Sequence, residues 1–399
     1  MVKENKMRLT EIGLLPEDWI LINLEENFNL KARIGWQGLT TAEYLETGNY
    51  GLVTGTDFKN GYIDWDNCVF VEKMRFDQDR NIQLKTGDVL VTKDGTIGKV
   101  AYVNFLPKPT TLNSGVFVVR PKLNNINNRF FYYVLMSFYF DDFLLKITAG
   151  STITHLYQKD FVNFNFVCPP SPEQKAIAEA LSDADAWIES LMELIAKKRL
   201  IKQGTMQELL TPKEGWEVKK LGEIVVINSG YSPSIFTFSE DGIPYLKVDE
   251  LNNSAKYTVK GSYFIKTESS IKKGSIIFPK RGASIFLNKI RILGEDSFMD
   301  TNLMTLTVPE NTNNEFLYYS LIFFGLDKIA DTTSIPQINN KHILPLEIPY
   351  PSLTEQTRIA TILSDMDAEL EVLEIQLAKA RQIKQGMMQE LLTGRVRLV

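Results

Sequence analysis

The chain has 399 residues, 44% hydrophobic and 23% charged side chains, and a formal net charge of −5. This length supports two or three domains with sizeable cores, and the slight acidity argues against a nonspecific nucleic-acid binder that relies on general basicity. Because no run of 18 apolar residues and no signal-peptide pattern occurs, we expect a cytoplasmic protein without a membrane segment.

Residues able to form disulfides or to bind zinc are rare in this sequence. The cysteines are Cys68 and Cys168, and the histidines are His155 and His342. None of them has the spacing typical of metal ligands. We therefore expect no disulfide framework and no metal site.

Two segments of the first half return in the second half as similar patterns. Residues 85–95 and 272–282 each indicate a turn, a short apolar strand and a polar tip that contains glycine. Residues 127–133 and 313–319 each open an aromatic-rich segment, which we interpret as a helix buried on a sheet. The aromatic side chains 130–133 are expected in the core.

A last strand precedes each of two long helices. The first strand ends in Pro169 and Pro170, and the second ends near Pro349 and Pro351. Proline interrupts a strand ladder but suits the first turn of a helix. These prolines are therefore expected to end the strand and start the helix.

The two long helices are copies of one another. Residues 173–211 return as residues 355–393 at a constant offset of 182, with 24 of 39 aligned positions identical. The chain is therefore two copies of one unit. Pro212 to Trp216, just after the first helix, resembles the chain's start at Pro16 to Trp19. Because the second helix ends in the same Leu-Leu-Thr, the chain's start resembles what would follow its end, and the architecture is expected to be quasi-cyclic.

Each helix carries apolar residues spaced alternately by four and three, which is a heptad seam that needs a partner. One isolated seam could equally pack on a globular core, but two near-identical seams in one chain favour mutual pairing. The seam residues are Ile177, Leu181, Ala184, Ile188, Leu191 and Ile195, then Ile359, Leu363, Met366, Leu370, Leu373, Leu377 and Ala380.

Charge predicts that the two helices pair antiparallel. Each copy is acidic early and basic late, which suits its own macrodipole. A parallel pair would place like charges together, whereas an antiparallel pair brings acid to base at both ends. The register follows, with the numbers of facing residues adding up to about 570. A merely solvated face would explain the charges but not their matched order.

These observations predict an α+β chain with two similar α/β domains, separated by two long helices that form an antiparallel coiled coil with a pseudo-two-fold repeat. The expected boundaries are residues 1–170 for the first domain, 171–211 for the first helix, 212–352 for the second domain, 353–393 for the second helix and 394–399 for a C-terminal tail.

Motifs for catalysis are not found in the sequence. Residues 95–100 superficially resemble a phosphate loop but lack its spacing and the Ser or Thr after lysine. Asp183 and Asp185, like the equivalent pair in the second helix, lie two residues apart and point to different sides, so metal chelation is not expected. No dinucleotide fingerprint or nucleophile elbow is present. We expect a chain that does no chemistry alone.

Three features together resemble the specificity subunits of type I restriction-modification systems. They are the repeated helices, the GDVLVTKDGTIGK run at residues 87–99, and the strand-Pro-Pro-x-x-Glu-Gln junction at residues 167–174. The likeness extends over essentially the whole chain. It implies a non-catalytic subunit with two target-recognition domains, each reading one half of a bipartite, asymmetric site in double-stranded DNA.

The resemblance also implies partners. Two modification (methyltransferase) subunits would dock around the helices, and restriction (endonuclease/translocase) subunits would join to cleave DNA. S-adenosylmethionine, ATP and Mg2+ would belong to those partners, and this chain would bind no cofactor. A helix of 39 residues is about 58 Å long, enough to reach major-groove segments about 34 Å or more apart. The helix pair would then act as a ruler.

Base edges are read by Arg, Lys, Asn, Gln, Ser and Thr, so polar side chains on exposed loop tips are the candidates for DNA binding. An ordinary polar loop is the alternative at each position. Asn113 and Asn302 are weaker candidates, and Tyr231 and Trp36 are expected in the core. The candidates are Lys93, Thr96, Lys99, Ser151, Thr152, Thr154 and His155 in the first half, then Lys280, Arg281, Ser284, Ser334, Gln337 and Asn339 in the second.

Two other classes of function remain open at this point. A coiled-coil scaffold with two protein-binding domains would show no salt-dependent affinity for DNA. A methyltransferase or a nuclease would need motifs that this sequence lacks.

Overall fold

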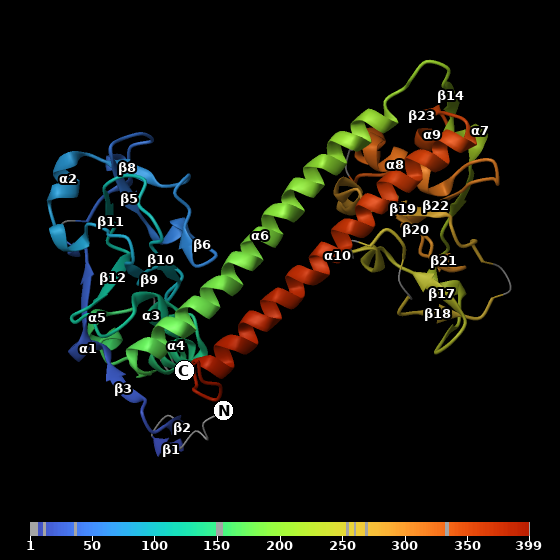
Figure 1. Cartoon of the computed structure of the whole chain (residues 1–399). Helices are drawn as coiled ribbons and strands as arrows, with labels where there is room; N and C mark the ends of the chain where they lie inside the picture. Colours follow the sequence, from blue (N-terminus) through green and yellow to red (C-terminus); the bar gives the residue numbers. More distant parts are fainter. Residues whose placement is uncertain are drawn as a thin grey trace. The chain divides into compact units, whose positions relative to one another are not determined.

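A computed structural model gives the fold of the chain. It divides into two compact units, Met1–Ser190 with Leu377–Val399, and Leu191–Gln376. Each unit holds a globular domain and part of each long helix, α6 (Ser171–Leu210) and α10 (Leu353–Leu391) (Figure 1). The structure describes residues 7–10, 13–35, 38–148, 155–252, 255–258, 261–267, 270–331 and 335–398.

The first unit is built on a six-stranded sheet in the order β4-β12-β9-β10-β7-β6. Strand β12 is antiparallel to β4 and β9, while β10 is antiparallel to β9 and parallel to β7. The strands are β4 (Phe28–Ala32), β6 (Phe58–Lys59), β7 (Tyr62–Ile63), β9 (Val89–Thr92), β10 (Val100–Tyr102) and β12 (Val116–Pro121).

Smaller elements surround this sheet. A three-stranded sheet has the order β11-β5-β8, and β1 pairs with β2 and β3 with β13. The strands are β1 (Met7–Thr10), β2 (Gly13–Pro16), β3 (Ile20–Asn23), β5 (Tyr50–Val53), β8 (Val69–Val71), β11 (Thr110–Leu112) and β13 (Asn165–Cys168), and the helices are α1 (Leu24–Asn27), α2 (Lys73–Asp77), α3 (Asn128–Leu135), α4 (Phe138–Thr148) and α5 (Gln158–Phe161), with 3-10 turns η2 (Thr41–Glu43), η3 (Gly55–Asp57) and η4 (Arg80–Ile82).

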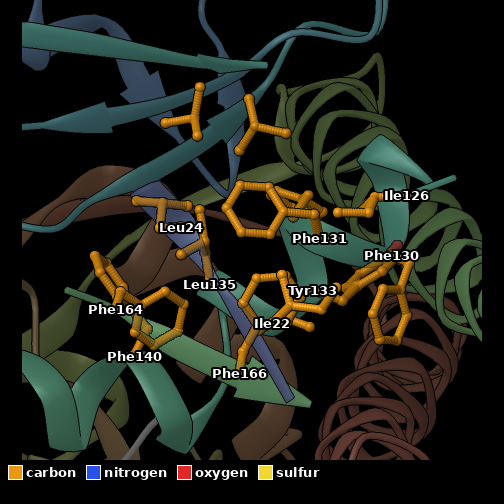
Figure 2. Packing of buried hydrophobic residues seen from close by; sticks show 14 of the residues in the cluster. Ile22, Leu24, Ile126, Phe130, Phe131, Tyr133, Leu135, Phe140, Phe164 and Phe166 are labelled. Atoms are coloured by element: carbon orange, nitrogen blue, oxygen red, sulfur yellow. The ribbon is translucent and has the colours of Figure 1, made fainter. Parts of the chain in front are cut away.

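Helix α3 forms the centre of this unit's core (Figure 2). Six of its eight residues, 130–135, are buried, as expected for a segment with apolar or aromatic side chains at every one of these positions. The Phe131 ring centroid lies 4.2 Å from that of Phe28 and 5.3 Å from that of Phe166. Each such fully buried phenylalanine contributes roughly 1.5–3 kcal/mol. The aromatic segment is thus confirmed as a helix buried against the sheet.

The second unit repeats this plan. Its main sheet has the order β15-β22-β19-β20, and a second sheet has the order β16-β18-β17-β21. The strands are β14 (Glu217–Lys220), β15 (Val226–Ser229), β16 (Phe238–Ser239), β17 (Ile243–Leu246), β18 (Phe264–Ile265), β19 (Ile276–Pro279), β20 (Arg291–Ile292), β21 (Phe298–Met299), β22 (Leu303–Thr307) and β23 (Glu347–Tyr350), and the helices are α7 (Leu221–Ile224), α8 (Asn314–Phe324) and α9 (Asn340–Ile343), with 3-10 turns η5 (Pro233–Ile235), η6 (Val248–Leu251), η7 (Ala283–Leu287) and η8 (Leu326–Ile329).

The internal repeat extends to strand pairing. The antiparallel order β15-β22-β19-β20 matches β4-β12-β9-β10, and the parallel pair β17-β21 matches the parallel pair β5-β11. The parallel bridge between Tyr62 and Tyr102 likewise returns as a parallel bridge between Tyr257 and Ile292. Two domains of weakly similar sequence therefore share one fold.

Within each unit the segments of α6 and α10 run antiparallel. In the second unit Lys198 Nζ lies 2.6 Å from Glu369 Oε1, and Arg199 Nη2 lies 2.6 Å from Glu374 Oε1. In the first unit Lys384 Nζ lies 2.5 Å from Asp185 Oδ1. The residue numbers in these pairs add up to within three of 570. The antiparallel direction and the register predicted from charge are confirmed.

The seam residues serve two purposes. Leu191 and Ile195 are buried but belong to neither domain's main core cluster, whereas Ile177 and Leu181 belong to the core cluster built around α3. The first turns of α10 pack in the same way on the second domain's core. Mutual pairing and packing on a globular core, stated above as alternatives, are therefore both present.

The end of the chain folds back onto its beginning within the first unit. Arg397 Nη2 lies 2.7 Å from Asp18 Oδ2, and Arg397 Nε lies 2.6 Å from Oε1 of the buried Glu173. Trp19 Nε1 donates to Glu173 Oε2 at 3.1 Å. Gly394 adopts φ +70° beside Pro16, where a Cβ would lie 2.6 Å from the proline ring. The quasi-cyclic closure predicted from sequence is thus a set of specific contacts.

Candidate nucleic-acid interface

The two predicted polar segments of the first unit meet at the end of β9. The backbone N–H of Leu156 donates to Lys93 O at 2.8 Å, and Asp94 forms an antiparallel bridge with His155. The side chains of these two residues also meet, with 2.7 Å between His155 Nδ1 and Asp94 Oδ1. The Lys93 ammonium lies 5.5 Å from the centroid of the Phe117 ring. The structure thus joins residues 61 to 63 positions apart in the sequence into one surface.

Buried Thr92 fixes the shape of the loop that follows β9. Its hydroxyl donates to Thr96 O at 2.5 Å and accepts the Lys99 N–H at 2.9 Å. Gly98 adopts φ +79°, and a Cβ there would lie 2.3 Å from Leu144 Cδ1. Gly98 therefore allows a tight turn against α4, and Thr96 and Lys99 remain exposed.

The second unit joins its two segments in the same way. The N–H of Ile338 donates to Lys280 O at 2.8 Å, and Arg281 forms an antiparallel bridge with Gln337. Gly282 adopts φ +87°, and its N–H donates to Pro336 O at 2.9 Å. Sequence position alone would not have shown that both halves close this junction with the same hydrogen-bond pattern.

The other predicted residues divide into described and undescribed positions. Ser284 is half-buried in η7, and Asn339 is exposed just before α9, where its N–H donates to His342 Nδ1 at 3.2 Å. His342 is therefore a local capping partner. The candidates Ser151, Thr152, Thr154 and Ser334, and also Trp36, lie outside the described residues.

Asn113 and Asn302 support these loops from the neighbouring turns. Asn113 Nδ2 donates to Tyr44 Oη at 2.7 Å, and Asn302 O accepts the Lys280 N–H at 2.8 Å. Both residues are half-buried. Their contacts give them a positioning role in the protein.

Tyr231 was expected in the core, and this expectation is wrong. Its side chain is 55% exposed and lies against Phe298, with ring centroids 5.5 Å apart. The preceding Gly230 packs so closely on Asp300 that a Cβ would lie 1.8 Å from its carbonyl oxygen. This contact holds the backbone at the surface, and no periodicity in the sequence indicates it.

A glutamine in the first turn of each long helix connects that helix to its domain by hydrogen bonds. Gln174 Oε1 accepts the Asn127 N–H at 2.8 Å, and Gln356 Oε1 accepts the Asn313 N–H at 2.9 Å. Both glutamines are buried, and each donates from Nε2 to the carbonyl of a preceding proline at 2.9 Å. The repeated Glu-Gln pair after the prolines therefore joins the start of each long helix to the N-cap of the aromatic helix.

One repeated serine meets residues of opposite charge in the two units. Arg129 Nη1 of α3 donates to Ser182 Oγ at 2.6 Å. At the equivalent place in the second unit, Ser364 Oγ donates to Glu315 of α8. Lys256 Nζ lies 3.0 Å from Glu315 Oε1 and donates to Ser364 Oγ at 2.8 Å. A hydroxyl can accept or donate, so the same helix position suits both domains.

A sequence comparison bears on what carries these loops. The profile of the family described as the type I restriction modification DNA specificity domain matches residues 16–198 and again residues 213–380. The chain belongs to this specificity family. The two matches also coincide with the two copies of the internal repeat.

Two relatives described as specificity subunits align with nearly the full length of this chain. The MjaVIII specificity subunit of Methanocaldococcus jannaschii is 27% identical, with 94% of this chain and 96% of the relative covered. A putative MjaX specificity subunit from the same organism is 25% identical, with 99% and 98% covered.

The fold of the specificity family is also found among solved structures. The crystal structure of a type I restriction-modification S subunit from M. genitalium superposes with a TM-score of 0.61 at 20% identity, with 97% of this chain and 98% of that chain covered. Among the residues described here, no group of three or more His, Cys, Asp or Glu side chains is placed to hold a metal ion. None of the described helices has the length and apolar character needed to cross a membrane.

Proposed function

We propose that this chain reads a bipartite, asymmetric site in double-stranded DNA, one half with each unit. The observation that carries the proposal is the repeated loop junction, in which Lys93 is tied to Leu156 and Lys280 to Ile338 by the same backbone hydrogen bond. A shared backbone frame with different side chains is what two readers of two different half-sites require.

In this proposal the chain supplies recognition, and partner subunits supply catalysis. Two modification subunits bind around the long helices and methylate adenines, and restriction subunits join them to cleave DNA. These partners hold S-adenosylmethionine, ATP and Mg2+. A chain with a net charge of −5 has no excess of positive charge to neutralise DNA phosphates. This fits a DNA-recognition subunit that depends on partners for part of its affinity.

The long helices set the gap between the half-sites in this proposal. Helix α6 has 40 residues and α10 has 39, so each is about 60 Å long at about 1.5 Å per residue. The gap in the DNA site is then a property of the helices, and the half-site sequences are a property of the domains.

Methylation mapping tests the proposal directly. DNA from cells that express a modification subunit with and without this chain is sequenced for methyladenine. We expect a motif of two different short half-sites with a fixed gap, present only with the chain. The purified chain alone, given S-adenosylmethionine, ATP and Mg2+, should neither methylate nor cut DNA.

The rival function, a scaffold with two protein-binding domains, predicts a different outcome. In that case the complex with the modification subunit would show no salt-dependent and sequence-dependent affinity for DNA. Activity of the lone chain would instead indicate an enzyme and contradict both alternatives.

A further inference from the structure

At one equivalent position of the loop junctions, the two units carry side chains of opposite charge. Asp94 follows Lys93 and precedes Gly95, and Arg281 follows Lys280 and precedes Gly282. The Asp94 side chain contacts His155, with 2.7 Å between Asp94 Oδ1 and His155 Nδ1. The Arg281 side chain is exposed, and among the described residues it has neither a hydrogen bond nor an ion pair.

The backbone under Arg281 is held on both sides. Its neighbour Lys280 donates its N–H to Asn302 O at 2.8 Å and accepts the Ile338 N–H at 2.8 Å, while Gly282 donates to Pro336 O at 2.9 Å. The left-handed φ of +87° at Gly282 turns the chain immediately after the arginine. A guanidinium without a partner among the described residues therefore extends from a fixed backbone, so that binding would order one side chain only.

The nearby lysine is less available than the arginine. Lys280 is half-buried, and burial lowers its pKa, partly offset by the charge of Asp300. Arginine offers a planar pair of donors that matches O6 and N7 of guanine in the major groove, the commonest specific contact between a protein side chain and a base. No other base presents two acceptors at that spacing.

We propose that Arg281 specifies a guanine in the half-site read by the second unit, through the O6 and N7 atoms of that base. The inference rests on the proposed function and assigns one base class to one residue. The first unit carries an acid–imidazole pair at the equivalent place, so it reads a different base, and the two half-sites differ at this position.

The test compares methylation motifs produced by the complex of the full chain with its modification subunit. The variants are Arg281→Gln, which removes the charge and the fork, and Arg281→Lys, which keeps the charge. Arg80→Gln is the matched control, because Arg80 is exposed and also lacks a side-chain partner among the described residues. Thermal melting checks that all variants fold.

The expected result is a motif that becomes degenerate at one guanine of a single half-site in both Arg281 variants, with the other half-site and the gap unchanged. Exchange of that guanine for 7-deazaguanine, which lacks N7, should weaken binding of the unaltered complex roughly tenfold, in line with loss of one good base contact. The same exchange should leave binding by the Arg281→Gln complex unchanged.

Two results would overturn the inference while leaving the proposed function intact. One is an unchanged motif with uniformly weaker and less salt-dependent binding, which would indicate a phosphate contact. The other is a half-site of the second unit that contains no guanine. Failure of the unaltered complex to methylate any defined sequence would overturn the proposed function and the inference together.

Discussion

Lys384 of α10 and Asp185 of α6 form an ion pair of 2.5 Å, and the residues equivalent to them by the internal repeat, Lys202 and Asp367, form the same contact in the second unit. Each aspartate also accepts a hydrogen bond from a tyrosine hydroxyl of its own domain, at 2.8 Å from Tyr133 in the first unit and at 2.6 Å from Tyr319 in the second. Burial and the nearby carboxylate raise the pKa of Tyr133, which therefore stays a donor. Helix pairing and domain docking thus meet at one carboxylate per unit.

The Lys384→Met variant should lose stability, because the half-buried Asp185 side chain would lose its ion-pair partner. The two side chains are only 17% and 16% exposed, so the loss should be about 1–3 kcal/mol, more than for a surface pair. Urea unfolding measures it. Lys379→Met is the control, since that exposed lysine has no ion pair among the described residues. Equal effects of both variants would contradict the role given to Lys384.

Exposed ion pairs in the second unit test the helix register. Reversing Lys198 and Arg199 to Glu places like charges beside Glu369 and Glu374, and should lower the melting temperature modestly because each exposed pair is worth under about 1 kcal/mol. Reversing both acids to Lys in the same protein should restore it. Lys197→Glu alone should have less effect, since Lys197 forms no ion pair among the residues that the structure describes. If the quadruple variant shows no rescue, the register is wrong.

The helix pair could be predicted from sequence because it is encoded twice, in apolar spacing and in charge order. The loop tips could be found because a glycine and a lysine follow an apolar strand in both halves. The exposure of Tyr231 could not be predicted, since it depends on a backbone contact between Gly230 and Asp300. The shared role of Ser182 and Ser364 could not be predicted from the sequence either. Arg129 and Glu315 have opposite charges, and they contact these serines only in the folded chain.

The two thiols report on the first unit. Burial raises the pKa of Cys68 and of Cys168 to about 12. A raised pKa means that the folded state disfavours the thiolate. The contribution of these thiols to the free energy of unfolding is therefore fully present below the ordinary pKa of about 9, and it is lost as the pH rises toward 12. At pH 8 we expect both thiols to react with a thiol reagent only on unfolding. Fast labelling of the native protein would contradict their burial.

The closure of the chain end predicts a strong effect of one arginine. Without Arg397, the fully buried side chain of Glu173 keeps one side-chain partner among the described residues, the Trp19 indole. Arg397→Ala should therefore destabilise the protein by about 3–5 kcal/mol in urea unfolding. Arg395→Ala, which removes only an exposed contact of 3.6 Å with Glu390, should cost under about 1 kcal/mol. A loss of similar size in both variants would show that the tail contact is unimportant.

The shared serine predicts opposite responses to one substitution at two equivalent sites. Ser182→Asp places a carboxylate beside Arg129, so stability should be kept or rise slightly. Ser364→Asp places the same group beside Glu315. Burial raises the pKa of Glu315, but its hydrogen bonds outweigh burial and hold that pKa below the ordinary value. Two carboxylates then share a partly buried place, and we expect a loss of about 1–3 kcal/mol, reduced in part by Lys256.

The matched controls are Ser182→Ala and Ser364→Ala, which remove one hydrogen bond each and should cost about 1 kcal/mol at both sites. The difference between the two Asp variants, after subtraction of the two Ala variants, isolates the charge term. Restoring Ser364→Asp with Glu315→Gln would confirm that repulsion is the cause. Equal losses in both Asp variants would show that the charge of the facing residue, Arg129 or Glu315, does not matter at this position. A neutral hydroxyl at positions 182 and 364 would then not be what lets the same helix position suit both domains.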